Sequence, residues 1–386
     1  MNGVGYKLIR IRTYHKGVKT TMRKIAFVIT DLYLGGAEIQ VCNLSDELSR
    51  KGYIVKIITL TGDAIISPED KKIEILPLLM DKGLFSFIRA YLHARKHILN
   101  FQPDIVHSHL VHGNIFSRLL RVTTPIPKLI STSHSSYEGG RLRALICRIT
   151  DPLTTISTNV SHEATECIVK RGSVNHKKIQ TIYNGINIEK FRFNEDYREK
   201  TRREIGIDCY TPLLLSVGRL TPAKDYHNLL RAFTAIKGRM PVDPQLVIIG
   251  GGPLESELKS LAATLGIANR VHWLGIKTNI NEWMSAADIF VLSSAWEGFG
   301  LVVAEAMTAE RVVVATDCGG IKEVLGGNGF LVPPDCSPAL AESIITALNL
   351  SPEDARKMGA ASRSHVEQYF SMSAITQKWL ALYRSL

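Results

Sequence analysis

The chain has 386 residues, of which 45% are hydrophobic and 22% are charged. This length is too great for one ordinary domain and suits two domains of roughly 150 to 200 residues with a cleft between them. No apolar run reaches the roughly 18 residues that a membrane-spanning helix needs, which argues against a chain that crosses the bilayer.

The formal charge of +11 is distributed unevenly. Residues 1–190 hold 27 Lys and Arg against 15 Asp and Glu, whereas residues 191–386 hold 20 against 21. The excess predicts an anionic partner for the first half, either nucleic acid or a membrane surface. No zinc finger or aromatic and basic RNA-binding pattern accompanies it, so we expect an anionic membrane surface and no nucleic acid.

The first 21 residues form a basic tail with five Lys and Arg and no acidic residue. They lack the apolar core of a signal peptide, and we expect them to be disordered. The tail is either an over-extended start ahead of Met22 or a basic arm that touches a membrane. The six cysteines lie far apart without a C-x-x-C pair, which favours reduced thiols and a cytoplasmic location.

A strand, helix and strand open the chain after the tail. We predict a strand over 24–30, a helix over 37–52 and a strand over 53–60, which make one βαβ unit. Residues 82–101 mix apolar side chains with Arg and Lys at helical spacing. This segment predicts a basic amphipathic helix, which either docks at a membrane interface or packs as an ordinary surface helix on its own sheet.

Further apolar runs alternate with helical segments and predict parallel sheets covered on both faces. The fold class expected is therefore α/β, with two doubly wound Rossmann-like domains facing a central cleft. We place the first domain at 22–190 and the second at 191–370, with a charged linker over 191–211. A final amphipathic helix spans 371–386, and packing back on the first domain is one arrangement open to it. The predicted later strands lie within 104–109, 128–134, 153–157, 178–186, 212–220, 245–252, 270–275, 287–294, 311–317 and 329–334.

Glycines cluster at predicted strand ends, where backbone amides can approach an anionic ligand closely. Each pair has a phosphate interpretation and a plain tight-turn interpretation. The triplet Gly250–Gly252 lacks the G-x-G-x-x-G spacing of a dinucleotide fingerprint, so we interpret it as structural. The other clusters are Gly35 with Gly36, Gly298 with Gly300, and Gly319 with Gly320.

The segment EGFGLVVAE places Glu297 seven residues ahead of Glu305, between two buried strands. This block resembles the nucleotide-sugar site of the retaining glycosyltransferases with the GT-B fold, in particular glycosyltransferase family 4. The resemblance implies that Glu297 binds the donor sugar and that Glu305 binds the ribose diol. Helix-end amides would then face the diphosphate, and those are the amides of Gly298, Phe299, Gly300 and Leu301.

The resemblance covers nearly the whole chain from Met22. SVGRLTPAKD matches the family's basic motif, so Gly218, Arg219 and Lys224 would bind the diphosphate and stabilise the leaving phosphate. GGAE, with Gly35 and Gly36, matches the family's glycine loop, which lies either under the donor phosphates or beside the acceptor. The segment 183–187 matches the interdomain hinge.

Histidines follow two strands of the first domain. The resemblance implies a catalytic role for His134 beside Arg219, Lys224 and Glu297, through a sugar hydroxyl and the anomeric centre; a hydrogen-bonded structural histidine is the alternative. His107, His109 and His112 suggest zinc, but no nearby acid or cysteine completes a tetrahedral set. His109 either lines the acceptor side of the cleft or packs in the core.

No D-x-D motif occurs, so we expect no metal and no cofactor, with the nucleotide sugar as a co-substrate. The chain departs from the family pattern at Lys322, where proline is common. We expect the amides of Gly319 and Gly320 to remain available, and Lys322 could add a phosphate contact.

The resemblance implies a metal-independent retaining hexosyltransferase. UDP-hexose or UDP-N-acetylhexosamine is favoured as the donor over GDP-mannose, with the base selected near 274–277. The basic first half predicts a lipid-linked saccharide acceptor in bacterial surface polysaccharide synthesis (O-antigen, lipopolysaccharide or capsule), peripherally at the inner face of the cytoplasmic membrane. Two rivals stay open, an isomerase like UDP-N-acetylglucosamine 2-epimerase and a non-catalytic nucleotide-sugar-binding protein.

Overall fold

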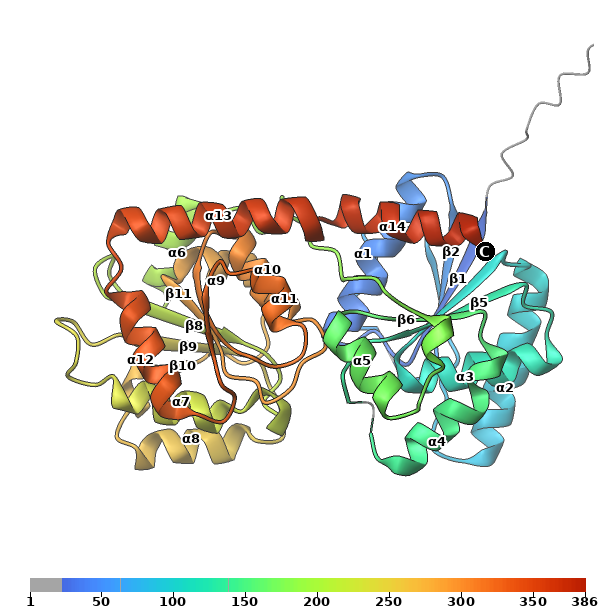
Figure 1. The fold of residues 1–386 in the computed structure, drawn as a ribbon, viewed down its shortest axis with the longest axis horizontal. Helices are drawn as coiled ribbons and strands as arrows, with labels where there is room; N and C mark the ends of the chain where they lie inside the picture. The colour runs from blue at the N-terminus through green and yellow to red at the C-terminus, as the bar shows by residue number, and fades with distance from the viewer. Residues whose placement is uncertain (1–22, 63, 138) are drawn as a thin grey trace, which may run out of the picture.

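The computed structural model describes residues 23–62, 64–137 and 139–386, so the basic tail lies outside the described residues. The chain forms two lobes side by side, each built on its own parallel sheet (Figure 1). Within the described residues, no helix is both long and apolar enough to span a bilayer.

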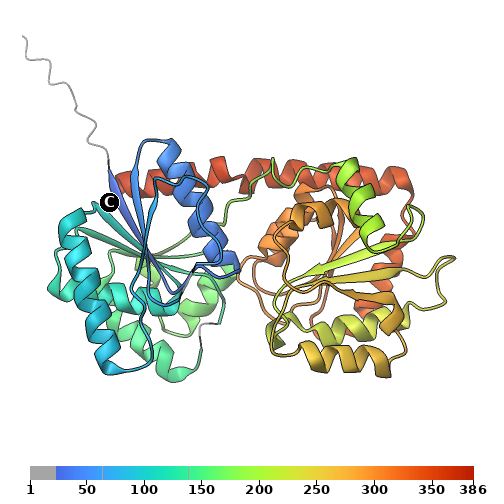
Figure 2. The same ribbon diagram turned by 180° about the vertical axis from the view of Figure 1, so that it is seen from behind.

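The first lobe contains a seven-stranded sheet in the order β3-β2-β1-β4-β5-β6-β7. Its strands alternate sides: Ile25 and Phe27 pack in the cluster that includes α1 and α14, whereas Ala26 and Val28 pack with α2 and α3. Helices therefore cover both faces (Figure 2). The strands are β1 (Lys24–Ile29), β2 (Ile54–Thr59), β3 (Glu74–Pro77), β4 (Ile105–His109), β5 (Lys128–Ser133), β6 (Ile156–Asn159) and β7 (Ile179–Thr181). The helices are α1 (Gly36–Arg50), α2 (Leu84–Phe101), α3 (Leu110–Thr123), α4 (Arg141–Thr150) and α5 (His162–Lys170).

The second lobe contains a six-stranded sheet in the order β10-β9-β8-β11-β12-β13, again parallel. The predicted fold class, two doubly wound α/β sheets, is confirmed. Its strands are β8 (Leu213–Val217), β9 (Gln245–Ile249), β10 (Val271–Trp273), β11 (Ile289–Leu292), β12 (Val312–Thr316) and β13 (Phe330–Val332). Its helices are α6 (Glu195–Glu204), α7 (Tyr226–Ala235), α8 (Glu255–Thr264), α9 (Ile280–Ala286), α10 (Leu301–Thr308), α11 (Ile321–Leu325), α12 (Ser337–Leu348) and α13 (Pro352–Phe370).

The segment 191–211, expected to be a charged linker, contains α6, which packs on the second lobe. Asn194 caps this helix by accepting a hydrogen bond from the Tyr197 amide at 2.9 Å. Arg198 and Arg202 both pair with the carboxylate of Asp288, at 2.5 and 3.4 Å. These two charges of the segment are thus paired with the lobe.

The chain crosses between the lobes twice, and the two crossings are hydrogen-bonded to each other. The Ile186 amide donates to the Phe370 carbonyl, and the Met372 amide donates to the Ile186 carbonyl, both at 2.8 Å. A Cβ on Gly185 would lie 2.9 Å from the Cα of Met372, so glycine permits this close approach. The hinge segment 183–187 therefore lies against the junction of α13 and α14.

The last helix, α14 (Met372–Ser385), packs on α1 of the first lobe. Its Trp379 lies 4.6 Å, centroid to centroid, from the ring of His107. Together α13 and α14 form a long bar along one side of both lobes (Figure 1). The C-terminus is therefore part of the core of the first lobe.

Candidate active site

The segment Glu297–Gly300 ends the loop between β11 and α10, at the carboxyl edge of the second sheet, and Leu301 begins the helix. Gly300 takes the left-handed conformation at φ 87° as the residue before the helix, where a Cβ would lie 2.2 Å from Ile321 Cδ1. Only glycine fits this turn. Among the described residues, none accepts a hydrogen bond from the amides of Phe299 or Gly300. These amides are free to bind an anion at the helix start.

Lys224 and Glu297 form an ion pair at the centre of the loop. Ser294 donates a second hydrogen bond to the same carboxylate oxygen of Glu297 at 2.7 Å. The Lys224 backbone is held as well, because Ser293 donates to its carbonyl at 2.8 Å. The structure therefore brings together a predicted cation and a predicted sugar-binding carboxylate from separate loops, both largely buried.

The loop that carries Gly218 and Arg219 is supported by the glycine triplet that follows β9. A Cβ on Gly250 would lie 1.9 Å from the Gly218 carbonyl oxygen, and one on Gly252 would lie 2.5 Å from that of Leu220. Larger residues would push the basic loop away. The triplet has this supporting role in the structure, as its spacing suggests.

Glu305 lies one turn into α10, because the helix begins at Leu301. Its side chain is buried, and burial raises its pKa from 4.5 to about 7, while the charge of Lys190 offsets part of the shift. A carboxylate held in a dry position without a paired cation is strongly disposed to accept hydrogen bonds from a ligand.

The glycine loop of the first lobe meets the second lobe directly. A Cβ on Gly36 would lie 2.9 Å from Leu301 Cδ1. One on Gly35 would lie 2.3 Å from the Glu38 carboxylate. Burial raises the pKa of Glu38 to about 7, and the charge of Arg219 acts in the opposite direction from across the cleft. The glycine loop and the basic loop thus face each other.

His134 and His109 form a hydrogen-bonded pair, with His134 Nε2 and His109 Nδ1 2.9 Å apart. Burial lowers the pKa of His134 to about 3 and that of His109 well below its usual range. Both imidazoles are therefore neutral. The other ring nitrogen of each, His134 Nδ1 and His109 Nε2, is buried without a hydrogen-bond partner among the described residues. Such orphaned atoms are unusual and mark a place for a ligand or water.

His107 is engaged in the core rather than in the cleft. Its Nδ1 lies 2.8 Å from the Tyr383 hydroxyl of α14, and its Nε2 lies 2.7 Å from Thr132 Oγ1. His112 lies apart on α3 and is exposed. In the described part of the chain, no group of three His, Cys, Asp or Glu side chains could hold a metal ion.

The two lobes are closed on each other at Gly298. A Cβ there would lie 2.0 Å from the His134 carbonyl oxygen. Ser161 donates to the Gly298 carbonyl at 2.7 Å, and Ser136 donates to the Glu297 carbonyl at 3.2 Å. The first lobe therefore holds the loop that carries the second lobe's sugar-binding candidates.

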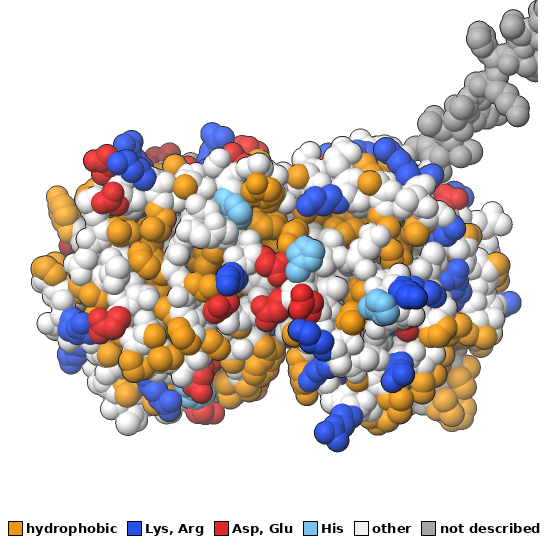
Figure 3. Space-filling view, viewed as in Figure 1, with side chains coloured by type: hydrophobic (Ala, Val, Ile, Leu, Met, Phe, Trp, Pro, Cys, Tyr) orange, Lys and Arg blue, Asp and Glu red, His pale blue; other side chains and the backbone are white. Residues whose placement is uncertain are grey.

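Two glutamates bridge the lobes reciprocally. Glu323 of α11 accepts hydrogen bonds from the His162 and Glu163 amides at the start of α5, at 2.9 and 3.0 Å. In return, Glu163 accepts one from the Gly319 amide at 3.0 Å. Figure 3 shows acidic side chains gathered along the seam on this face. Each carboxylate thus accepts hydrogen bonds from amides near a helix start of the opposite lobe, which have no partner within their own helix.

The expectation that the Gly319 and Gly320 amides remain available is wrong for this arrangement of the lobes. The Gly319 amide donates to Glu163, and the Gly320 amide donates to the Gly298 carbonyl at 3.1 Å. Lys322 points into solvent from α11 rather than into a pocket with partners. A diphosphate would therefore meet the α10 amides before those of this glycine pair.

We expect Glu323→Gln to loosen the lobes. The substitution removes the negative charge that faces two α5 amides and the Tyr183 hydroxyl, which donates at 2.8 Å. The free energy of unfolding should fall by about 1 to 3 kcal/mol in urea denaturation. The matched control is Glu166→Gln, because Glu166 forms an exposed pair with Lys170 on α5. It should change the free energy of unfolding by under about 1 kcal/mol. Equal effects of the two substitutions would contradict the bridging role.

Several residues of the site have no isolated sequence signal. Ser136, Ser161 and Glu163 act across the seam, although each is 130 or more positions from its partner. Glu323 has a signal in the sequence, because it closes a GG-x-x-E segment that begins at Gly319. Ser294 could have been suspected because it precedes Glu297 by three residues.

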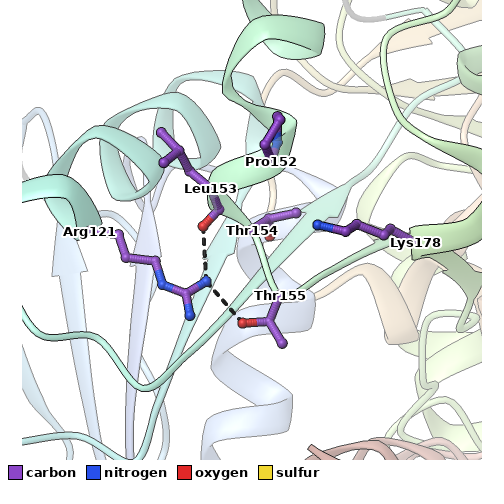
Figure 4. A pocket seen from close by; sticks show the side chains of 6 residues that line it. All are labelled: Arg121, Pro152, Leu153, Thr154, Thr155 and Lys178. Atoms are coloured by element: carbon purple, nitrogen blue, oxygen red, sulfur yellow. Dashed lines mark hydrogen bonds between the residues drawn. The ribbon is translucent and has the colours of Figure 1, made fainter.

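A surface hollow of about 510 Å³ lies elsewhere in the first lobe, beside Thr155 at the amino-terminal end of β6 (Figure 4). Its Arg121 donates to the Leu153 carbonyl at 2.9 Å and to Thr155 Oγ1 at 3.0 Å. Ligands of open parallel sheets bind at the opposite, carboxyl edge. Two cations line the hollow: Arg121, which is committed to these two oxygens, and Lys178. Because the hollow lies away from the carboxyl edge of the sheet, we do not assign the site there.

Two doubly wound lobes meet here at the carboxyl edges of their sheets. The ion pair of Lys224 with Glu297, the buried Glu305 and the free helix-start amides lie at this seam, which is the arrangement of a two-domain transferase of the GT-B type. The chain belongs to the glycosyltransferases: it matches the family models "Glycosyltransferase Family 4" over residues 34–190 and "Glycosyl transferases group 1" over residues 197–365.

Relatives and solved structures agree with this assignment. The chain is 30% identical over 292 residues to the putative glycosyltransferase EpsD of Bacillus subtilis, which covers 72% of this chain and 75% of that protein. HepE of Anabaena, solved with UDP and glucose, superposes with a TM-score of 0.82 at 20% identity, over 94% of this chain and all of that one. WaaG, a glycosyltransferase involved in lipopolysaccharide biosynthesis, gives 0.72 at 18% identity, over 93% and 99%.

Proposed function

We propose that this glycosyltransferase takes a hexose or N-acetylhexosamine from a nucleotide sugar, and that a UDP-sugar is the donor. The observation that carries the proposal is the buried Glu305 one turn below the free amides of the Phe299–Gly300 loop. A ribose diol on Glu305 would leave its diphosphate at those amides. HepE, a protein of the same fold, is solved with UDP. GDP-mannose is the second donor to test.

We propose metal-independent transfer with retention of anomeric configuration. Arg219 and Lys224 would neutralise the departing diphosphate, as helix-start amides and cations do elsewhere. Glu297, already paired with Lys224, would accept hydrogen bonds from the sugar hydroxyls. His134 is neutral, so it would act as a hydrogen-bonding group near the anomeric carbon through its unpartnered Nδ1. His109 would hold the His134 ring and border the acceptor.

We propose a lipid-linked saccharide as the acceptor, in the synthesis of a bacterial surface polysaccharide such as O-antigen, lipopolysaccharide or capsule. The support is the positive charge of residues 1–190 and the apolar side chains that α2 leaves exposed. The enzyme would then work at the inner face of the cytoplasmic membrane. WaaG is a structural neighbour with a lipopolysaccharide role of its own.

Donor binding should weaken as pH falls below 7. A pKa of about 7 for Glu305 means that the acceptor-only carboxylate is lost below that pH, which costs up to about tenfold in Kd per pH unit. Calorimetric titration with UDP from pH 5.5 to 8.5 would measure this. Glu305→Gln is the control, because its Kd still depends on the protonation of UDP and of Glu38 but no longer on that of residue 305. A wild-type to variant Kd ratio that stays constant over this range would contradict the role.

The same raised pKa has a consequence for stability. Because the folded chain binds this proton more tightly than the unfolded chain, Glu305 adds stability below pH 4.5, and the contribution is lost as pH rises through about 7. A ligand that satisfies the ionised carboxylate should offset this loss above pH 7.

The test of the proposed reaction uses radiolabelled UDP-sugar with and without a lipid extract that contains polyprenyl-diphosphate saccharides. We expect label in the lipid fraction only when the acceptor is present. Formation of an epimer without acceptor would favour the isomerase alternative, and donor binding with no product would favour a non-catalytic binding protein. Either result would overturn the proposal.

A further inference from the structure

Helix α4 presents its apolar residues to solvent instead of to the core. Leu142, Leu145 and Ile149 recur at helical spacing and are 72%, 51% and 67% exposed, while Cys147 and Thr150 are buried. An ordinary surface helix buries such a stripe. This helix is amphipathic in the reverse sense, which requires another environment for its apolar side.

The exposed stripe continues over the neighbouring helices. On α2, Phe85 is 90% exposed and Leu92 is 58% exposed, and on α3 Val122 is 65% exposed. Helix α3 joins the other two, because Arg95 of α2 donates to the Thr123 carbonyl at 3.2 Å and Arg118 of α3 donates to the Cys147 carbonyl of α4 at 3.1 Å. Figure 3 shows hydrophobic side chains gathered over this part of the first lobe. We call these exposed residues of α2, α3 and α4 the three-helix face.

The charge of this face has one sign. Helices α2, α3 and α4 contain no Asp or Glu, and six of their Lys and Arg residues are exposed: Arg89, Arg95 and Lys96 on α2, and Arg141, Arg143 and Arg148 on α4. Next to α4, Arg171 stacks over the ring of Tyr137 at 4.3 Å, and Tyr137 is itself half-exposed. Apolar side chains ringed by cations, with an aromatic at the border, match the acyl and anionic headgroup layers of a bilayer.

We propose that the three-helix face docks on a bilayer that contains anionic lipid. This inference rests on the proposed lipid-linked acceptor, and it assigns the membrane-binding side chains to α4 as well as α2. The geometry gives the docking a purpose: α4 begins at Arg141, seven residues after His134 at the cleft. A lobe seated on α4 would hold the mouth of the cleft at the headgroup layer, where a lipid-linked saccharide projects.

The test measures co-sedimentation of the full chain with phosphatidylglycerol vesicles and with phosphatidylcholine vesicles. The variant is Leu145→Asp with Ile149→Asp, whose side chains point into solvent and leave the core intact. The matched control is Tyr210→Asp with Val242→Asp, two exposed apolar residues of the second lobe. The basic tail is common to all three proteins, so differences between them report the face alone.

We expect the α4 variant to bind phosphatidylglycerol vesicles at least tenfold more weakly than wild type, and the control to bind like wild type. Thermal unfolding and UDP binding in solution should match in all three. If the α4 variant bound the vesicles as well as wild type does, the docking face would be overturned. The same would hold if the wild-type chain did not bind the vesicles, which is the result expected if a protein covers the face. If the wild-type chain did not bind UDP, the proposed function would be overturned, whatever the result with vesicles.

Discussion

Lys224→Ala should lower kcat/KM by about 10²- to 10³-fold. Lys224 is fixed by its ion pair with Glu297 and by the hydrogen bond from Ser293 to its carbonyl. It would meet the departing diphosphate without reorganising, and loss of one such group removes about 3 to 4 kcal/mol of transition-state stabilisation. The effect should appear mainly in kcat, because the charge to be stabilised grows as the glycosidic bond breaks.

The control for this prediction is Lys237→Ala, on an exposed lysine beyond the end of α7. It should leave kcat/KM within about twofold of wild type. Glu297→Gln removes the ion pair with Lys224 but keeps the size of the side chain at 297, so it separates the loss of the ion pair from the loss of the lysine. A Lys224→Ala enzyme within threefold of wild type would remove the lysine from the catalytic group.

Gly298→Ala should abolish productive closure of the lobes. Its Cβ would lie 2.0 Å from the His134 carbonyl oxygen and 2.8 Å from the carbonyl carbon, and neither atom is at the end of a flexible side chain. The lobes would have to separate by an ångström or more, and a displacement of that size costs about 10²-fold in rate. UDP affinity should change little, because Glu305 and the α10 amides belong to one lobe.

Two measurements check the closure prediction together. Small-angle scattering should show a larger radius of gyration for Gly298→Ala than for wild type, while turnover falls. Gly140→Ala is the control, because nothing lies within 4 Å of a Cβ at that glycine. If both the radius of gyration and the turnover stayed unchanged, the lobes would accommodate the added methyl group at residue 298 without separating, and this would contradict the prediction.

The sequence predicted the features that depend on local pattern. Buried runs such as 24–29 and 312–316 specify parallel strands through nearly continuous hydrophobicity, and the Glu297 to Glu305 spacing specifies a loop and a helix start. The short strand β3 over 74–77 was missed, because its four residues at the sheet edge are only partly buried and carry little signal.

The features missed at the site depend on contacts between distant segments. Periodicity says that α4 is amphipathic, but not that its apolar side faces outward, since this depends on what α3 already covers. The exchange between Glu163 and Glu323 joins helix starts 160 positions apart, which no local pattern encodes. The pairing of His109 with His134 follows from the adjacency of β4 and β5, and could have been inferred once those strands were placed side by side.

We propose that the seam between the lobes binds a nucleotide sugar without metal. Thermal unfolding of the full chain in EDTA, with UDP-sugars and GDP-mannose each at 100 times its Kd, tests it directly. A bound donor should add about 2.7 kcal/mol to the free energy of unfolding, and the gain should shrink in Glu305→Gln. No stabilisation by any nucleotide sugar, or stabilisation only after a divalent cation is added, would contradict the account.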